Sequence, residues 1–303
     1  MGAPGPSFPL AYSPLMADPQ QYANAPVWLI TGCSTGFGRE LARAVLDRGH
    51  RAVVTARNPE SVRDLAAGRP DAQAHVQQLD VTNQPEVEAA VQAAEETFGR
   101  VDVLVNNAGI GYFGAIEESD EAEVRRMFEI NFWGLSAMTR AVLPGMRRRK
   151  HGHVVNISSI GGLRAFPAVG YYNATKFAVV GFSEALAQEV GPLGIKVTVV
   201  EPSGFRTDWA GRSANEATVH IADYDGTAGK NRAGIRGYSG KQPGDPARAA
   251  DAIIRAVESD DPPLHLLLGK AALNGARRKL DELRRDFDAW EETTVGADFP
   301  EGE

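Results

Sequence analysis

Residues 31–38 read TGCSTGFG and lie between a short apolar run at 27–30, VWLI, and a helical pattern over 38–48. Glycines let the backbone turn tightly and approach a ligand phosphate without a Cβ in the way. The start of a helix adds unpaired N–H groups and the positive end of the helix dipole, which attract anions. In this setting the stretch predicts a dinucleotide-binding loop, although a glycine-rich turn can also serve only to connect two elements.

Beyond this loop, short β-branched runs alternate with longer helical segments. We expect strands at 27–30, 51–56, 74–78, 101–106, 153–157, 196–201 and 264–268, and helices at 38–48, 85–98, 121–149, 171–190, 246–258 and 271–290. Strands that are apolar on both faces and separated by helices are typical of a parallel sheet covered on both sides. The expected fold is a single doubly wound α/β domain over residues 26–292, with helices on both faces of the sheet.

Three segments do not follow this pattern. Residues 1–25 contain scattered prolines and no apolar period, so we expect a disordered extension, within which Met16 could be the natural start. Residues 293–303 are acidic and are expected to form a flexible tail. Residues 208–245 follow the carboxyl end of a strand, where ligands bind in such sheets, and predict a lid over the substrate. The alternative for this long segment is a plain flexible insertion.

Composition narrows the classes of protein. The 303 residues include 39 acidic and 32 basic ones, a net charge of −7, which argues against nucleic acid as a partner. The single cysteine, Cys33, excludes an intrachain disulfide and a multi-cysteine metal site and fits a reducing cytoplasm. Its position at a helix start could lower the thiol pKa for a redox role, or it could simply lie beneath the phosphates. We expect a cytoplasmic protein without metal or membrane span.

The spacing TGxxxGxG resembles the short-chain dehydrogenase/reductase family, and four further segments match that family in order. They are NNAG at 106–109, Asn131, the pair Ser158 and Ser159, and YNATK at 172–176. A YxxxK match alone means little, whereas five segments in order over residues 27–268 are specific. The resemblance implies hydride transfer between a nicotinamide cofactor and a carbonyl compound or secondary alcohol.

The resemblance also implies four catalytic residues: Asn131, Ser159, Tyr172 and Lys176. Free tyrosine has a pKa of about 10, and a lysine four residues later on the same helix face would lower it, so that Tyr172 could act as general acid and base. Lys176 would also hold the nicotinamide ribose, Ser159 the substrate oxygen, and Asn131 a water next to the lysine. Ser158 and Tyr171 are the competing assignments, and Asn131 could instead only bond backbone.

The second expected strand ends at Ala56, where family members that use NAD carry an acidic residue for the ribose 2′-hydroxyl. Arg57 follows, and a guanidinium suits a 2′-phosphate, so the sequence favours NADP(H) over NAD(H). Asp80 resembles the family's acidic residue at the adenine, or is an ordinary turn aspartate. The cofactor-binding residues implied by the resemblance are Gly32, Ser34, Thr35, Gly36, Phe37, Gly38, Arg57, Asp80, Val81, Asn107, Ala108, Gly109, Tyr172, Lys176, Pro202 and Thr207.

One segment departs from the family pattern. After Pro202 the family usually has glycine, and here Ser203 could crowd the nicotinamide or alter the turn. Four aromatic residues would rim the site and weakly favour apolar ketones or alcohols, namely Tyr112, Phe113, Phe205 and Trp209. The alternative function is non-catalytic sensing of NADP(H). A sensor needs no proton relay, so the presence of Asn131, Ser159, Tyr172 and Lys176 argues against it.

Small residues recur on one stripe of the helix that carries the tyrosine and lysine: Ala174, Ala178, Gly181 and Ala185. Such a stripe lets another helix approach closely, and it could pack either on the protein's own sheet or on a second subunit. The family resemblance favours the second subunit, so we expect a homodimer or homotetramer with a two-fold contact.

Overall fold

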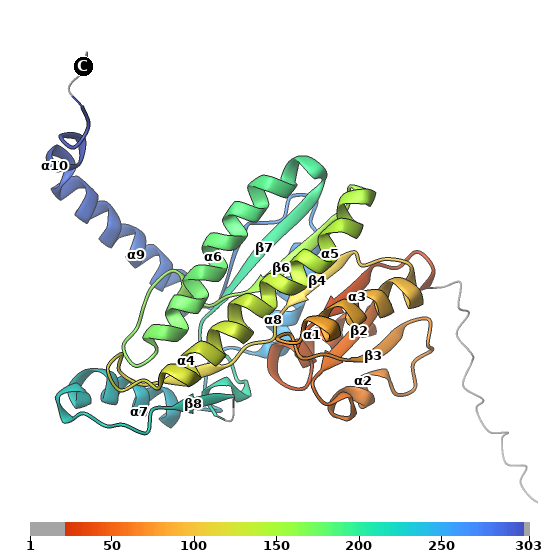
Figure 1. The fold of residues 1–303 in the computed structure, drawn as a ribbon, viewed down its shortest axis with the longest axis horizontal. Coiled ribbons are helices and arrows are strands. Elements are labelled where there is room, and N and C mark those ends of the chain that lie inside the picture. Colours follow the sequence, from red (N-terminus) through yellow and green to blue (C-terminus); the bar gives the residue numbers. More distant parts are fainter. Residues whose placement is uncertain (1–21, 212, 300–303) are drawn as a thin grey trace, which may run out of the picture.

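Seven parallel strands form the central sheet, in the order β3–β2–β1–β4–β6–β7–β9 (Figure 1). The computed structural model describes residues 22–211 and 213–299. From β1 the chain winds outward to β3, and it then returns to place β4 on the other side of β1. This reversal opens a crevice at the carboxyl ends of β1 and β4, where ligands bind in such sheets. The strands are β1 Val27–Ile30, β2 Arg51–Ala56, β3 Ala74–Gln78, β4 Val103–Asn106, β6 Gly152–Ile157, β7 Ile195–Pro202 and β9 His265–Leu268.

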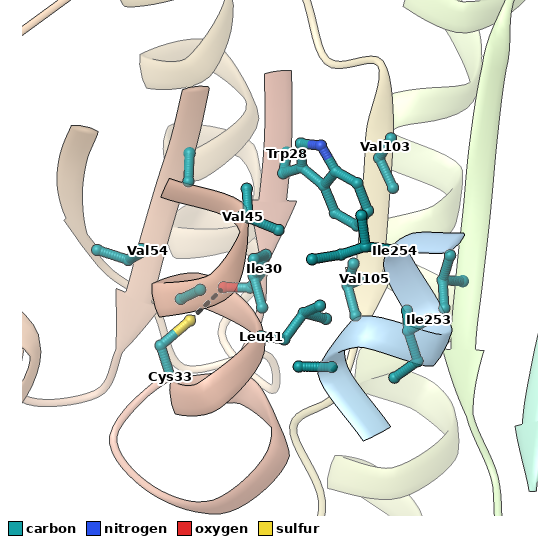
Figure 2. Packing of buried hydrophobic residues seen from close by; sticks show 14 of the residues in the cluster. Trp28, Ile30, Cys33, Leu41, Val45, Val54, Val103, Val105, Ile253 and Ile254 are labelled. Atoms are coloured by element: carbon teal, nitrogen blue, oxygen red, sulfur yellow. Dashed lines mark hydrogen bonds between the residues drawn. The ribbon is translucent and has the colours of Figure 1, made fainter. Parts of the chain in front are cut away.

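The predicted α/β fold class is confirmed, and strand β1 shows why the sequence requires it. All four of its residues are buried. Trp28 and Ile30 point into a cluster formed with helices α1 (Gly36–Asp47) and α8 (Pro246–Val257), which Figure 2 shows. Val27 and Leu29 point to the opposite face, against α3 (Gln84–Phe98), α5 (Leu135–Arg149) and α6 (Gly170–Val190). Because successive residues of a strand face opposite sides, an apolar strand needs helices on both.

The helix expected over 121–149 is divided in the structure. It consists of α4 (Glu121–Phe128), a π-helical turn (Glu129–Gly134) and α5. A π turn widens the helix locally and often lies at a functional site. A short 3₁₀ turn, Pro59–Val62, and helix α2, Arg63–Ala66, were not predicted because they are too short to show a period.

The segment 208–245, predicted to be a lid over the substrate, contains regular elements that were not predicted. They are β8 (Ala214–Glu216) and α7 (Lys230–Gly237), with the short turns Asp208–Ala210 before β8 and Ala222–Tyr224 and Asp225–Gly229 between β8 and α7. Strand β8 pairs in parallel with β5 (Gly111–Phe113), a hundred residues away, as a separate two-stranded sheet. Strands of three residues carry no detectable alternation, so their pairing could not be predicted.

The two ends also differ from the expectation. Residues 1–21 lie outside the described part, but residues 22–25 form a turn in which Tyr22 is buried. The Ala25 carbonyl accepts hydrogen bonds from Nε and Nη2 of Arg51 at 3.0 and 2.7 Å. At the other end, α9 (Lys270–Ala289) is followed by α10 (Glu291–Val295), whose last three residues lie in the expected tail. None of the helices described is long and apolar enough to cross a membrane.

Candidate active site

The glycine loop joins β1 to α1. Gly32 and Gly36 have positive φ angles of 70° and 58°, which side-chain-bearing residues rarely adopt. A Cβ at Gly38 would lie 2.4 Å from both the Gly32 carbonyl oxygen and Asn107 Nδ2, so only glycine fits there. Thr35 precedes the helix without capping it through its side chain. The first N–H groups of α1 therefore remain available to an anion in the cavity that this loop lines.

Thr31 and Asn107 hold the glycine loop in place. Thr31 Oγ1 accepts hydrogen bonds from the N–H groups of Asn107 and Ala108, both at 2.9 Å. Asn107 Nδ2 donates to the carbonyl oxygens of Thr31 and Gly32 at 2.9 and 3.0 Å. Asn107, predicted to bind the cofactor, thus uses its side chain to position the loop. Thr31 was missed as a site residue, although it is the first residue of the quoted motif.

One cavity of about 970 Å³ runs from the glycine loop past the carboxyl ends of the strands to α9. Nearly all predicted site residues line it. The two that do not are Gly38, packed beneath the loop, and Asn131, which is 1% exposed. A fold that brings so many separate segments to one cavity, with glycines where a Cβ would collide, fits a dinucleotide.

Tyr172 and Ser159 meet in this cavity. Their side chains share a hydrogen bond. Ser159 Oγ also accepts the N–H of Gly161 at 3.0 Å. The competing Ser158 donates its hydroxyl to the Lys176 carbonyl oxygen at 3.1 Å, and Tyr171 does not line the cavity. The geometry thus favours Ser159 and Tyr172 over their neighbours.

The pKa of Tyr172 differs from the expectation. Burial raises it to about 12, and the hydrogen bond from Ser159 offsets only part of this effect. Burial also lowers the pKa of Lys176 to about 8. Lys176 Nζ lies 5.7 Å from the centroid of the Tyr172 ring and donates to the Ile157 carbonyl oxygen at 2.8 Å. The expected lowering of the tyrosine pKa is therefore wrong for the protein's own side chains, because desolvation is the largest effect on that pKa.

Asn131 lies in the π-helical turn and bonds mainly to backbone. Its Oδ1 accepts the Ile110 N–H at 2.8 Å, and its Nδ2 donates to the Ile110 carbonyl oxygen at 2.9 Å and to Thr175 Oγ1 at 3.2 Å. A Cβ at Gly109 would lie 3.3 Å from Asn131 Oδ1 and 3.8 Å from Lys176 Nζ. Glycine at this position keeps the space between the amide and the ammonium group open.

The end of the cavity near β2 and β3 carries Arg57 and Asp80. Arg57 is exposed, lines the cavity, and makes no hydrogen bond or ion pair within residues 22–211 and 213–299. Ala56, beside it, is buried. Asp80 lines the cavity too, while its Oδ1 accepts the N–H and the hydroxyl of Thr82 at 3.0 and 2.8 Å. Asp80 is thus a turn aspartate that also faces the cavity.

Ser203 does not disturb the turn after β7. Its N–H and its hydroxyl both donate to the Leu268 carbonyl oxygen, at 3.0 and 3.3 Å. Gly269, with a φ of 92°, makes room for it, since a Cβ there would lie 2.5 Å from Ser203 Oγ. Pro202 and Thr207 line the cavity on either side of this turn, and Thr207 packs against Gly36.

The predicted aromatic rim is only half correct. Phe205 and Trp209 line the cavity, whereas Tyr112 and Phe113 are buried behind it in a cluster that includes Tyr172. Successive residues of a strand face opposite sides, so both faces of β5 are covered. Sequence reasoning missed the remaining wall because it comes from distant segments: Phe166, Ile235, Tyr238, Ala271, Asn274 and Arg278.

The Cys33 side chain points into the core beside Ile30 (Figure 2). It is fully buried, its thiol donates to the Ile30 carbonyl oxygen at 3.2 Å, and burial raises its pKa to about 12. A thiol with so little thiolate is not a redox centre, so that hypothesis is wrong. The described residues contain no group of three side chains suited to hold a metal ion.

Comparisons with known proteins agree with this geometry. The family model for short chain dehydrogenases matches residues 26–218. The oxidoreductase BOA17 of Botryotinia fuckeliana is 37% identical over 271 residues, covering 89% of this chain and 98% of that protein. The 3-ketodihydrosphingosine reductase of Bacteroides thetaiotaomicron is 43% identical over 201 residues, 65% of this chain and 70% of that protein.

Solved structures show the same fold. A short-chain dehydrogenase from Streptomyces avermitilis is 43% identical with a TM-score of 0.85, covering 91% of this chain and 99% of that one. A Burkholderia phymatum relative in complex with NAD is 26% identical, with a TM-score of 0.76 over 86% of this chain and 95% of that one. A variant of the actinorhodin polyketide ketoreductase with NADPH is 30% identical, with a TM-score of 0.70 over 82% and 98%. The chain is thus an oxidoreductase that uses a nicotinamide cofactor, and it belongs to the short-chain dehydrogenase/reductase family.

Proposed function

We propose that this protein is an NADP(H)-preferring oxidoreductase that interconverts ketones and secondary alcohols. The observation that carries the cofactor preference is the pair at the end of β2. Ala56 offers no carboxylate for a ribose 2′-hydroxyl, and the exposed Arg57 faces the cavity with its guanidinium uncommitted among the described residues. A guanidinium binds a phosphate by two parallel charge-assisted hydrogen bonds.

When bound, the nicotinamide would supply or accept the hydride at the carbonyl carbon. In the reduction, Tyr172 donates its phenolic proton to the carbonyl oxygen, and in the oxidation it takes that proton back. Ser159, already bonded to Tyr172, holds the same oxygen in line. Lys176 stabilises the tyrosinate that forms, which matters here because burial alone raises the tyrosine pKa to about 12. Asn131 supports the backbone at Ile110 beside the lysine.

The substrate portion of the cavity favours apolar groups beside the carbonyl. Its wall includes Phe166, Phe205, Trp209, Ile235 and Tyr238. The Trp209 and Tyr172 rings lie 4.8 Å apart, so an apolar substituent would pack directly against the reacting centre. Two of the similar proteins are named 3-ketodihydrosphingosine reductase and actinorhodin polyketide ketoreductase, and both names refer to the reduction of a ketone.

A second subunit is also part of the proposal. On α6 the small residues Ala174, Gly181 and Ala185 are exposed, and a Cβ at Gly181 would meet nothing within 4 Å. The exposure of these three residues argues against packing of the stripe on the protein's own sheet, which was the alternative; Ala178 is half-buried. We propose a two-fold contact through this stripe, giving a homodimer or homotetramer. Replacing Ala178→Arg should halve the particle mass measured by light scattering.

The test of cofactor choice is Arg57→Ala. Loss of one charge-assisted contact costs about 1.5–3 kcal/mol, so the KM for NADPH should rise roughly tenfold or more, with little change for NADH. Equal effects on both cofactors would reject the assignment. The non-catalytic sensor remains the competing function. It would bind NADPH tightly yet fail to oxidise it with any member of a panel of aliphatic and aromatic ketones.

A further inference from the structure

Helix α9 starts at the cavity wall and then leaves the body of the molecule (Figure 1). Its first turns are anchored, since Ala272 and Ala276 are buried and Glu282 pairs with Arg164 at 3.5 Å. From residue 284 to residue 299 every residue is exposed, although α9 and α10 occupy most of this stretch. A helical segment of this length is marginal in water without tertiary packing on one face. Residues 284–299 therefore lack the packing partner that would stabilise their helical part.

The apolar residues of α9 have the spacing of a helix-pairing seam. Leu273, Leu280 and Phe287 are seven residues apart, and Leu283 follows Leu280 at three residues. Trp290 follows Phe287 at the same spacing, directly after the end of α9. Such a 3–4 alternation is the pattern of two packed helices. Leu280, Phe287 and Trp290 are 63%, 66% and 64% exposed, so this seam, as described, faces solvent.

The charges beside the seam indicate which kind of partner would pack against it. Residues 270–285 carry six basic and two acidic side chains, net +4, whereas residues 286–295 carry four acidic and no basic ones, net −4. Two copies of α9 side by side in opposite directions would place each basic half against an acidic half. In a parallel pair, Lys279 would face Arg284 and Asp286 would face Glu291 across the seam, both of like charge. A lipid surface with anionic headgroups would attract the basic half but repel the acidic half, whereas the antiparallel pair satisfies both.

We propose that α9 pairs with α9 of a second copy of this chain as an antiparallel two-helix contact, with its two-fold axis near Arg285, where the charge changes sign. This contact is separate from the stripe on α6 and does not depend on the reaction proposed above. With both two-fold contacts formed the assembly is a tetramer, and with only this one it is a dimer.

The first experiment measures particle mass by light scattering at micromolar concentration. The double variant Leu280→Glu and Phe287→Glu places two charges in the seam and should halve the mass, whichever other contact exists. Ala289→Glu, on the outer face of the same helix, is the matched control and should leave the mass unchanged. Leu280, Phe287 and Ala289 are all exposed, so we expect both variants to fold, with a melting temperature close to that of the wild type. A wild-type monomer, or a double variant of unchanged mass, would overturn the proposal.

The second experiment determines the direction of pairing. Cys33 is fully buried, so a spin label reacts only with an introduced cysteine. Arg278 and Arg285 lie on the same face of the helix, two helical turns apart, and each is replaced by cysteine in turn; Arg278 also lines the edge of the cavity. In the antiparallel pair the label distance between copies should be short at 285 and longer at 278, with about 21 Å of axial separation. Equal distances at both positions would indicate a parallel pair and refute the proposal, as would binding of the monomer to phosphatidylcholine vesicles through this seam.

Discussion

The two ends of the active-site cavity are built in different ways. The cofactor end consists of the glycine loop and neighbouring strand ends, where glycines and backbone bonds fix the shape, as with Thr31 and Asn107. The substrate end is assembled from β5, the 208–245 segment and α9, which are far apart in sequence. There the Arg236 guanidinium donates to the carbonyl oxygens of Ala210, Gly211 and Ala214 and lies 4.6 Å from the Phe113 ring centroid. A short motif can specify the cofactor end. At the substrate end, the Arg236 side chain links several loops that are far apart in sequence.

The largest expected effect lies at α6, between the two ends. Tyr172→Phe keeps the ring against Trp209 and removes the hydroxyl that bonds to Ser159. General acid catalysis contributes about 10²–10⁴-fold, so kcat should fall by roughly a thousandfold. The Kd for NADPH, measured by fluorescence titration, should stay within about twofold. A variant that keeps a substantial part of the reductase rate would exclude Tyr172 as the proton donor.

Gly38→Ala tests the rigidity of the cofactor end. Its Cβ would lie 2.4 Å from backbone and from Asn107, so the loop must shift. Overpacking of this kind costs about 1–3 kcal/mol, and NADPH binding should weaken by roughly ten- to a hundredfold. Gly191→Ala is the control, because a Cβ there meets nothing within 4 Å and φ is negative. Unchanged NADPH affinity in Gly38→Ala would mean that the loop adapts and is not fixed by its glycines.

The pH dependence of the rate reports on the buried lysine. Burial lowers the pKa of Lys176 to about 8, so the ammonium is present below that pH and lost above it. If the charge stabilises the tyrosinate, kcat for the reduction should decline above pH 8, by about tenfold per unit once the lysine is neutral. A rate that stays flat between pH 8 and 10, with the protein folded by circular dichroism, would contradict this role.

Arg236→Ala should have the smallest effect of these variants, and we expect it to alter substrate binding without altering cofactor binding. Three carbonyl oxygens lose a donor, and β8 loses its link to the turn at Asp208–Ala210. We expect the KM for the ketone to rise about three- to tenfold, since the side chain is partly exposed, while the Kd for NADPH stays unchanged. Lys230→Ala, exposed on the same helix, is the control. An equal loss of NADPH affinity would show that the two ends are not independent.

The sequence alone determined the features that depend on the pattern of residues within a short stretch of the chain. Alternating strands and helices predicted the parallel sheet, because a strand buried on both faces reads as a continuous apolar run, as at 27–30. The glycine loop was predicted since Gly32, Gly36 and Gly38 are required by backbone geometry within eight residues. Ser159, Tyr172 and Lys176 could be named because their order and spacing resemble the short-chain dehydrogenase/reductase family.

Only the tertiary structure decided the rest. Tyr112 and Phe113 are both buried because the surrounding segments cover both faces of β5, and a three-residue strand carries no signal of such cover. The pKa of Tyr172 is raised and not lowered, since desolvation depends on how completely the surrounding segments cover the ring. The same holds for Cys33, whose position in the chain suggested reactivity and whose burial removes it. Periodicity and motifs record local geometry, whereas burial and long-range pairing arise only when distant segments pack together.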